Sequence, residues 1–147
     1  MAVSIRRARE DDAAPVAGLL GQLGYPADAE RVRAGLRDWH ADPRGVVLVA
    51  DVDGAVAGLA SLYAVPFLER GVSRGRLTAL VVDGAYRGQG LGRALVTHAE
   101  EAARRLGCGD MEITSARERA VALGLYARLG YVDTSGDAAR LLKPLDA

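Results

Sequence analysis

The stretch LVVDGAYRGQGLGRALVTHAEEAARRLG, residues 80–107, joins an apolar run to a long amphipathic helix through a glycine-rich turn. The apolar run, Leu77 to Val82, is typical of a buried strand. After the turn, apolar residues recur at the spacing of one helix face: Leu91, Leu95, Ala99, Ala102 and Leu106. Gly107 follows the last of these and predicts the end of the helix. Residues 77–107 therefore predict a strand, a glycine turn and a helix in immediate succession.

The N-terminal residues predict a strand and two helices. Residues 3–9 alternate loosely, which favours a strand. Asp11 and Asp12 are N-cap candidates for a helix that Gly24 ends, and Pro15 suits its first turn. The apolar face of a second helix carries Val32, Leu36 and Trp39.

Residues 46–63 predict a β-hairpin. Two β-branched and apolar runs, 46–52 and 55–63, flank Asp53-Gly54. This dipeptide favours the positive φ values that a tight hairpin turn needs. The residues between Tyr63 and Leu77, which include a proline and two glycines, predict a loop.

The C-terminal residues predict a strand at 111–114, a helix at 120–129 closed by Gly130, and final strands from Tyr131 onward and at 140–142. The predicted order is then strand, two helices, three strands, helix, strand, helix and strands. This order indicates a mixed α/β domain and not a strict βαβ repeat.

The composition fits one globular domain spanning residues 1–147, because half of the residues are hydrophobic and 26% are charged. Lys and Arg balance Asp and Glu at 19 each, which gives no electrostatic case for nucleic acid or an anionic membrane surface as a partner. Cys108 is the only cysteine, so a disulfide within the chain and a Cys-rich metal site are excluded. No signal peptide or membrane-spanning run is recognised, and one cysteine suits a reducing compartment, so we expect a cytoplasmic protein. We also expect no bound metal.

The glycine turn predicts an anion site. The first amides of a helix have no partner within the helix, and the helix dipole adds partial positive charge there. A diphosphate can therefore bind the amides of residues 88–93. A P-loop lysine and the Rossmann glycine spacing are both missing. A nucleotide-binding protein is thus disfavoured, and a turn that only closes a strand–helix corner stays an alternative.

Two ordered motifs resemble the GCN5-related N-acetyltransferase (GNAT) superfamily. Arg87-x-x-Gly90-x-Gly92 after the strand matches the family pattern Q/R-x-x-G-x-G/A. The later block, Arg119-x-x-Ala122-x-x-Leu125-Tyr126-x-x-Leu129-Gly130-Tyr131, resembles the family's last helix and the strand after it. The resemblance covers nearly the whole chain. It implies a mostly antiparallel central sheet flanked by helices.

The resemblance also implies acetyl-CoA as co-substrate. The pyrophosphate would bind the amides of Gly88, Gln89, Gly90, Leu91, Gly92 and Arg93, next to Arg87. The pantetheine arm would lie along Leu80, Val81 and Val82, where this strand diverges from the next one. An amide near Leu80 or Val81 would polarise the thioester carbonyl. Arg119, where many relatives have asparagine, would contact the cofactor.

The family chemistry is direct attack of an amine on the thioester, which needs an acid and a base. Tyr126 matches the family tyrosine that contacts the cofactor near its sulfur and protonates the leaving thiolate. Many relatives place a glutamate where this chain has Thr78, so the usual base is absent. Glu112 is our candidate, with Glu69, His40, a water chain, or loss of the proton before binding as alternatives. Cys108 is expected to be structural.

The leading hypothesis is an N-acetyltransferase for a primary amine of a small molecule or peptide. Helices one and two and the loop 66–76 would form the acceptor site, with Trp39, His40, Tyr63, Phe67 and Glu69 as its walls. Glu69 could then bind a cationic acceptor. The alternative is an acyl-CoA-binding regulatory protein of the same fold without turnover. A homodimer is expected from the family alone.

Overall fold

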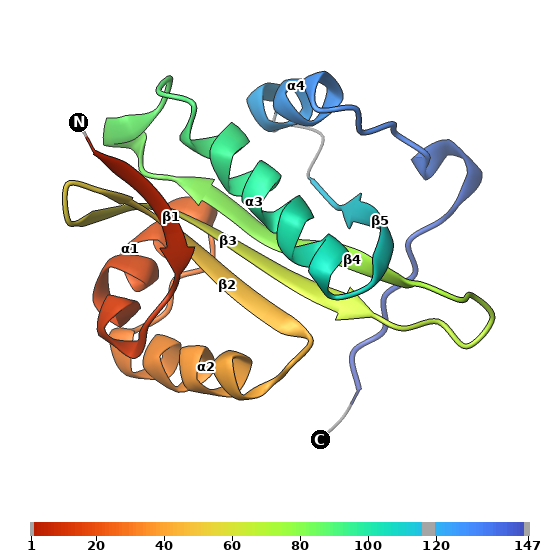
Figure 1. The fold of residues 1–147 in the computed structure, drawn as a ribbon, viewed down its shortest axis with the longest axis horizontal. Helices are drawn as coiled ribbons and strands as arrows, with labels where there is room; N and C mark the ends of the chain where they lie inside the picture. The colour runs from red at the N-terminus through yellow and green to blue at the C-terminus, as the bar shows by residue number, and fades with distance from the viewer. Residues whose placement is uncertain (1, 116–119, 146–147) are drawn as a thin grey trace. The chain divides into compact units, whose positions relative to one another are not determined.

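A computed structural model describes residues 2–115 and 120–145. The chain divides into two compact units, Met1–Thr114 and Ser115–Ala147. The first unit runs β1 (Val3–Arg7), α1 (Ala13–Leu23), α2 (Ala29–Ala41), β2 (Gly45–Val52), β3 (Ala55–Val65), β4 (Ser73–Val82), α3 (Leu91–Arg105) and β5 (Cys108–Ile113). Short 3-10 turns, η1 (Glu10–Asp12) and η2 (Gly84–Tyr86), precede α1 and follow β4. Figure 1 shows these elements along the chain.

The first unit is built on one five-stranded sheet in the order β1-β2-β3-β4-β5. The first three pairings are antiparallel and the last, β4 with β5, is parallel. The predicted mixed α/β fold with a mostly antiparallel sheet is therefore confirmed. The predicted hairpin is confirmed as well, because Asp53 and Gly54 both have positive φ, at 52° and 90°.

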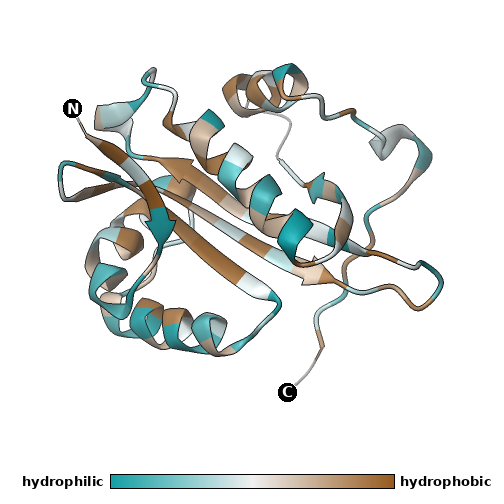
Figure 2. Ribbon diagram, viewed as in Figure 1, coloured by the Kyte–Doolittle hydropathy of each residue, from teal (hydrophilic) through white to brown (hydrophobic). Residues whose placement is uncertain are grey.

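One face of the sheet packs on α1 and α2. Val49, Leu59 and Val81 lie opposite one another on β2, β3 and β4. They share a buried cluster with residues of the two helices, namely Ala13, Val16, Leu19, Val32 and Leu36. In Figure 2 hydrophobic residues concentrate in these central strands. Because burial of these apolar residues is favourable, the two helices of residues 13–41 pack on this face of the sheet.

The other face of the sheet packs on α3, whose Leu95, Val96 and Ala99 are fully buried. A Cβ at Gly58 of β3 would lie 2.9 Å from Cδ1 of Leu95, so the close approach of helix and sheet needs glycine there. Helix α3 thus carries one apolar face and one hydrophilic face, as its sequence predicts (Figure 2). Within 2–115 and 120–145, no helix combines the length and the apolar character needed to cross a membrane.

Asp12 anchors the start of α1 to β1. Its carboxylate, only 5% exposed, accepts hydrogen bonds from both Nη atoms of Arg6 and from the Arg9 amide. The Arg6 guanidinium therefore lowers the pKa of Asp12. Asp12 does occupy the N-cap of α1, as predicted, but its side chain does not cap that helix. The Asp12 carboxylate instead accepts hydrogen bonds from the Arg9 amide in the preceding turn and from Arg6.

Strands β4 and β5 both begin earlier than the sequence indicates. Strand β4 starts at Ser73 and not at Leu77, because it pairs with β3 as far as Val65 and with β5 from Cys108. Gly75, predicted to lie in a loop, is inside the strand. A Cβ there would lie 2.6 Å from Sδ of Met111, so glycine marks a close approach and not a turn.

The second unit contains α4 (Ala120–Arg128) and a 3-10 turn, η3 (Ser135–Asp137). Gly130 closes α4 with a φ of 95°, as predicted, and the Tyr131 amide donates to the Tyr126 carbonyl at 3.0 Å. The predicted strands from Tyr131 and at 140–142 are wrong, since described residues 131–145 contain no strand. Asp133 accepts from the Ser135 amide and hydroxyl, and this local turn competes with an extended pairing.

Candidate functional site

The turn between β4 and α3 is exposed and held in a conformation that requires glycine. Gly88 and Gly90 both have a φ of +79°, and Gly90 is the N-cap of α3. No heavy atom lies within 4 Å of a Cβ built at either position, so backbone conformation and not space selects glycine. The first helical hydrogen bond runs from the Ala94 amide to the Gly90 carbonyl at 3.1 Å. The amides before Ala94 therefore have no acceptor inside the helix.

Side chains and main chain on both sides fix this turn. Asp83 caps η2 by accepting from the Ala85 amide at 3.0 Å, and Gln22 of α1 accepts from the Gly84 amide at 3.0 Å. Leu91, at the first position of α3, is buried. The helix N-terminus is thus held at the end of β4, with its dipole directed at the exposed turn.

Strands β4 and β5 separate beside this turn. Their pairing ends at Leu77 and Ile113, whereas β4 stays paired with β3 as far as Val82. Residues 78–82 therefore present one strand edge without a strand partner among the described residues. This divergence is the one that the resemblance implies. Because the open edge leads into the glycine turn, an extended ligand can add as a strand and place an anion at the turn.

An open groove of about 400 Å³ lies between the end of α2 and strands β3 and β4. It is lined by residues of α2, β3 and β4 and of the turn after α2: Asp38, Trp39, Asp42, Tyr63, Val65, Arg76 and Thr78. The Thr78 hydroxyl lies 2.6 Å from the Ser61 hydroxyl. A hydroxyl thus occupies the position aligned with the family glutamate.

Tyr63 ties two walls of this groove together. Its hydroxyl donates to Oδ2 of Asp42 at 3.0 Å, and its ring meets the Trp39 ring edge-on with centroids 5.9 Å apart. The hydrogen bond to the Asp42 carboxylate, with desolvation, raises the pKa of Tyr63. Tyr63 therefore stays protonated at neutral pH. The Arg44 amide donates to the other oxygen of Asp42 at 2.9 Å, which fixes the carboxylate.

The three predicted base candidates occupy different surroundings. Glu112 on β5 is ion-paired with Arg76, its register partner on β4, and lies 3.9 Å from Arg74. Glu69 is exposed in the loop between β3 and β4. Neither carboxylate lines the groove. The structure therefore places Arg76, and not a glutamate, at the groove wall.

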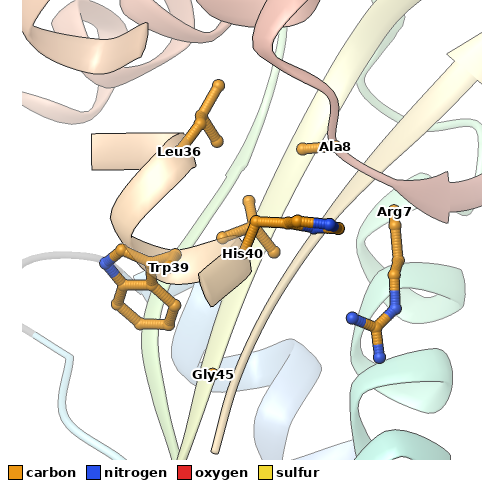
Figure 3. A pocket seen from close by; sticks show the side chains of 7 residues that line it. Arg7, Ala8, Leu36, Trp39, His40 and Gly45 are labelled. Atoms are coloured by element: carbon orange, nitrogen blue, oxygen red, sulfur yellow. The ribbon is translucent and has the colours of Figure 1, made fainter. Parts of the chain in front are cut away.

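His40, the third base candidate, lines a separate and much smaller pocket with Arg7, Leu36 and Trp39 (Figure 3). In Figure 3 the Trp39 and His40 side chains leave the end of α2 in different directions. The pocket holds about 10 Å³, room for about one water molecule. It is too small to take an acceptor.

Tyr126 lies on α4 in the second unit and is 9% exposed. Its ring meets the Tyr131 ring edge-on, with centroids 6.0 Å apart. Arg119 lies outside the described residues. Cys108 begins β5, and burial raises the pKa of its thiol, which disfavours a thiolate nucleophile. Within 2–115 and 120–145, no group of three His, Cys, Asp or Glu side chains is arranged to hold a metal ion.

Sequence reasoning did not single out four groove residues, Asp38, Asp42, Val65 and Arg76, although Asp38 and Arg76 lie in the segments predicted to form the acceptor site. A signal existed for two of them, because Asp38 and Asp42 are four residues apart around the end of α2. Arg76 is the register partner of Tyr63 across β3 and β4, which no local pattern reveals.

The structure is that of a mixed α/β protein in which a parallel strand pair opens beside an exposed glycine turn. The family model for the acetyltransferase (GNAT) family matches residues 11–131, and the chain belongs to this family. No curated protein sequence matches the chain.

Solved structures agree with the family assignment. A transcriptional regulator from Bacillus halodurans C-125 is 25% identical with a TM-score of 0.85, over 99% of this chain and 100% of that one. A Trypanosoma brucei acetyltransferase is 29% identical with a TM-score of 0.77, over 99% and 100%. The fold is also that of AAC(6')-Iy, solved with the bisubstrate analogue CoA-S-monomethyl-acetylneamine, at 17% identity, 100% and 99% coverage and a TM-score of 0.82.

Proposed function

We propose that the protein transfers the acetyl group of acetyl-CoA to a primary amine of a small molecule or peptide. The observation that carries this proposal is the open edge of residues 78–82 leading into the exposed turn at 88–93. Main-chain groups alone suffice there for an extended arm and a diphosphate. The family model matches residues 11–131 and so includes parts of both compact units, which supports our proposal of one functional domain over residues 1–147.

The cofactor site is proposed from the main chain of two segments. The amides of Gly88, Gln89, Gly90, Leu91, Gly92 and Arg93 would hold the pyrophosphate, and the exposed Arg87 and Arg93 side chains would add positive charge. Leu80, Val81 and Val82 would hold the pantetheine arm. An amide at Leu80 would stabilise the oxyanion that forms on the thioester. Arg119 would contact the cofactor, as the resemblance implies.

The chemistry needs one proton removed from the amine and one delivered to the sulfur. We propose Tyr126 as the donor to the thiolate, because a phenol is protonated at neutral pH. We propose Glu112 as the acceptor of the amine proton. Since Arg76 and Arg74 engage Glu112, proton transfer to it would require a water or a shift of Arg76.

A thiol-release assay with acetyl-CoA and a panel of primary amines tests the function. We expect release with at least one amine and a fall of about 100-fold in kcat for Tyr126→Phe. Glu112→Gln should lower kcat/KM at neutral pH by about tenfold. Unchanged kcat/KM in Glu112→Gln would instead mean that the amine loses its proton before binding. Calorimetry with CoA, expected unchanged in both variants, separates chemistry from cofactor binding.

The second candidate function is an acyl-CoA-binding regulatory protein without turnover. Two observations favour it: Thr78 stands in place of the family glutamate, and one similar structure is that of a transcriptional regulator. Tight CoA binding without thiol release from any amine would support this function. Sedimentation velocity would test the homodimer that the family leads us to propose.

A further inference from the structure

The groove adjoins the proposed cofactor edge directly. Arg76 and Thr78 line the groove, and they flank Leu77, the last residue of β4 that pairs with β5. An acetyl group carried along residues 78–82 would therefore meet whatever occupies the groove. The chemistry of the groove walls then indicates which amine is accepted, if the proposed transfer function holds.

The charge of the groove is negative. Two carboxylates, Asp38 and Asp42, contribute to its lining, against one cation, Arg76. Arg76 is already ion-paired with Glu112, which does not line the groove. Asp42 is held in place by Tyr63 and by the Arg44 amide, whereas Asp38 is exposed on α2. Two acidic residues and one arginine that is already ion-paired outside the groove give the lining an excess of negative charge, which favours a cation.

The remaining walls are apolar and aromatic. Trp39 and Tyr63 stand edge-on to each other, and Val65 lies beyond Tyr63 on β3. Indole and phenol rings attract ammonium groups through their faces and pack against methylene chains. The walls therefore suit an aliphatic chain with charged ends better than a heavily hydroxylated sugar.

We propose that the groove selects an aliphatic amine that carries a second cationic group, and that Asp38 and Asp42 determine this specificity. The non-reacting ammonium lies against the two carboxylates of the α2 wall, and the reacting amine reaches the β4 wall at Thr78. Glu69, expected from the sequence to bind a cation, is exposed in its loop and does not line the groove.

Matched acceptors of similar length test this inference. We compare kcat/KM for 1,4-diaminobutane, butylamine and 4-aminobutanoate in the thiol-release assay. We expect the diamine to exceed the monoamine by about tenfold and 4-aminobutanoate to be the poorest. Asp38→Asn should remove most of the preference, measured as the ratio of kcat/KM for the diamine to kcat/KM for butylamine. Glu30→Gln removes a carboxylate from the same helix outside the groove and should change neither value.

The outcomes of these assays distinguish failure of this inference from failure of the proposed function. Equal kcat/KM for diamine and monoamine, or an equal loss for both in Asp38→Asn, overturns the inference and leaves the transfer function intact. Preference for a peptide N-terminus over every diamine does the same. Absence of release with any amine, with CoA binding preserved, overturns the transfer function and the inference together. Melting curves of Asp38→Asn and Glu30→Gln verify that both variants are folded.

Discussion

The proposed cofactor edge and the proposed acceptor groove are neighbours along β4, but the edge offers main-chain groups and the groove offers side chains. The edge uses main-chain groups of two segments that are nearly continuous in sequence, 78–82 and 88–93. The groove uses side chains of α2, β3 and β4. A main-chain site depends on backbone conformation and tolerates most side-chain changes, whereas a side-chain site changes specificity with single substitutions. One fold can therefore keep its cofactor while changing its acceptor.

The largest expected effect is on the stability of the first unit, which contains both regions. Asp12→Asn should lower the free energy of unfolding by about 2–3 kcal/mol, because Arg6 loses the carboxylate of the buried Asp12 and keeps the more exposed one of Asp51. Urea unfolding followed by circular dichroism measures this. Asp12 has a lowered pKa in the folded state, so its contribution is present above its unfolded pKa of about 4 and is lost as pH falls through the folded value. The wild-type and variant stabilities should therefore converge once the pH is below the lowered folded pKa of Asp12. A difference that persists there would show that the ion pair is not the cause.

The next effect concerns the main-chain region alone. Gly90→Ala should weaken CoA binding by about 10–100-fold in calorimetry, because an alanine disfavours the φ of +79° that shapes the turn. Gly54→Ala is the matched control, since Gly54 has a φ of +90° in the β2–β3 hairpin and equally open surroundings. Both variants should lose about 1–2 kcal/mol of stability, and only Gly90→Ala should lose affinity. Equal affinities would contradict the assignment of the turn to the cofactor.

The smallest effect concerns the side-chain region alone. Tyr63→Phe removes the hydroxyl that positions Asp42 and should raise the acceptor KM by about threefold with CoA affinity unchanged. Tyr25→Phe, a change of an exposed tyrosine in the loop after α1, is the control and should have no effect. The pKa of Tyr63 is raised above its ordinary value of about 10, so its hydrogen bond should persist up to pH 10 and be lost only above it. A change in CoA affinity in Tyr63→Phe would mean that the two regions are not independent.

Local patterns in the sequence predicted the elements that positive φ and amphipathic spacing specify. The Asp53-Gly54 hairpin, the glycine turn that leads into α3 and the apolar faces of α1, α2 and α3 are all confirmed. The sequence did not predict the strand pairing as well. Gly75 and the early starts of β4 and β5 depend on Met111 and on partners distant in sequence. The prediction of final strands is wrong for a related reason, because an extended sequence pattern becomes a strand only where a partner strand is available.

The sequence by itself determined the class of the protein and the proposed cofactor segment, because a glycine turn at a helix N-terminus is a local device whose residues are adjacent in the chain. Only the tertiary structure decided that Asp38, Asp42 and Tyr63 line one groove, and that Glu112 is engaged by Arg76. These groups come from separate elements, and the register of the sheet and the packing of α2 upon it bring them together. Side-chain sites of this kind follow from long-range packing, which no short stretch of sequence encodes.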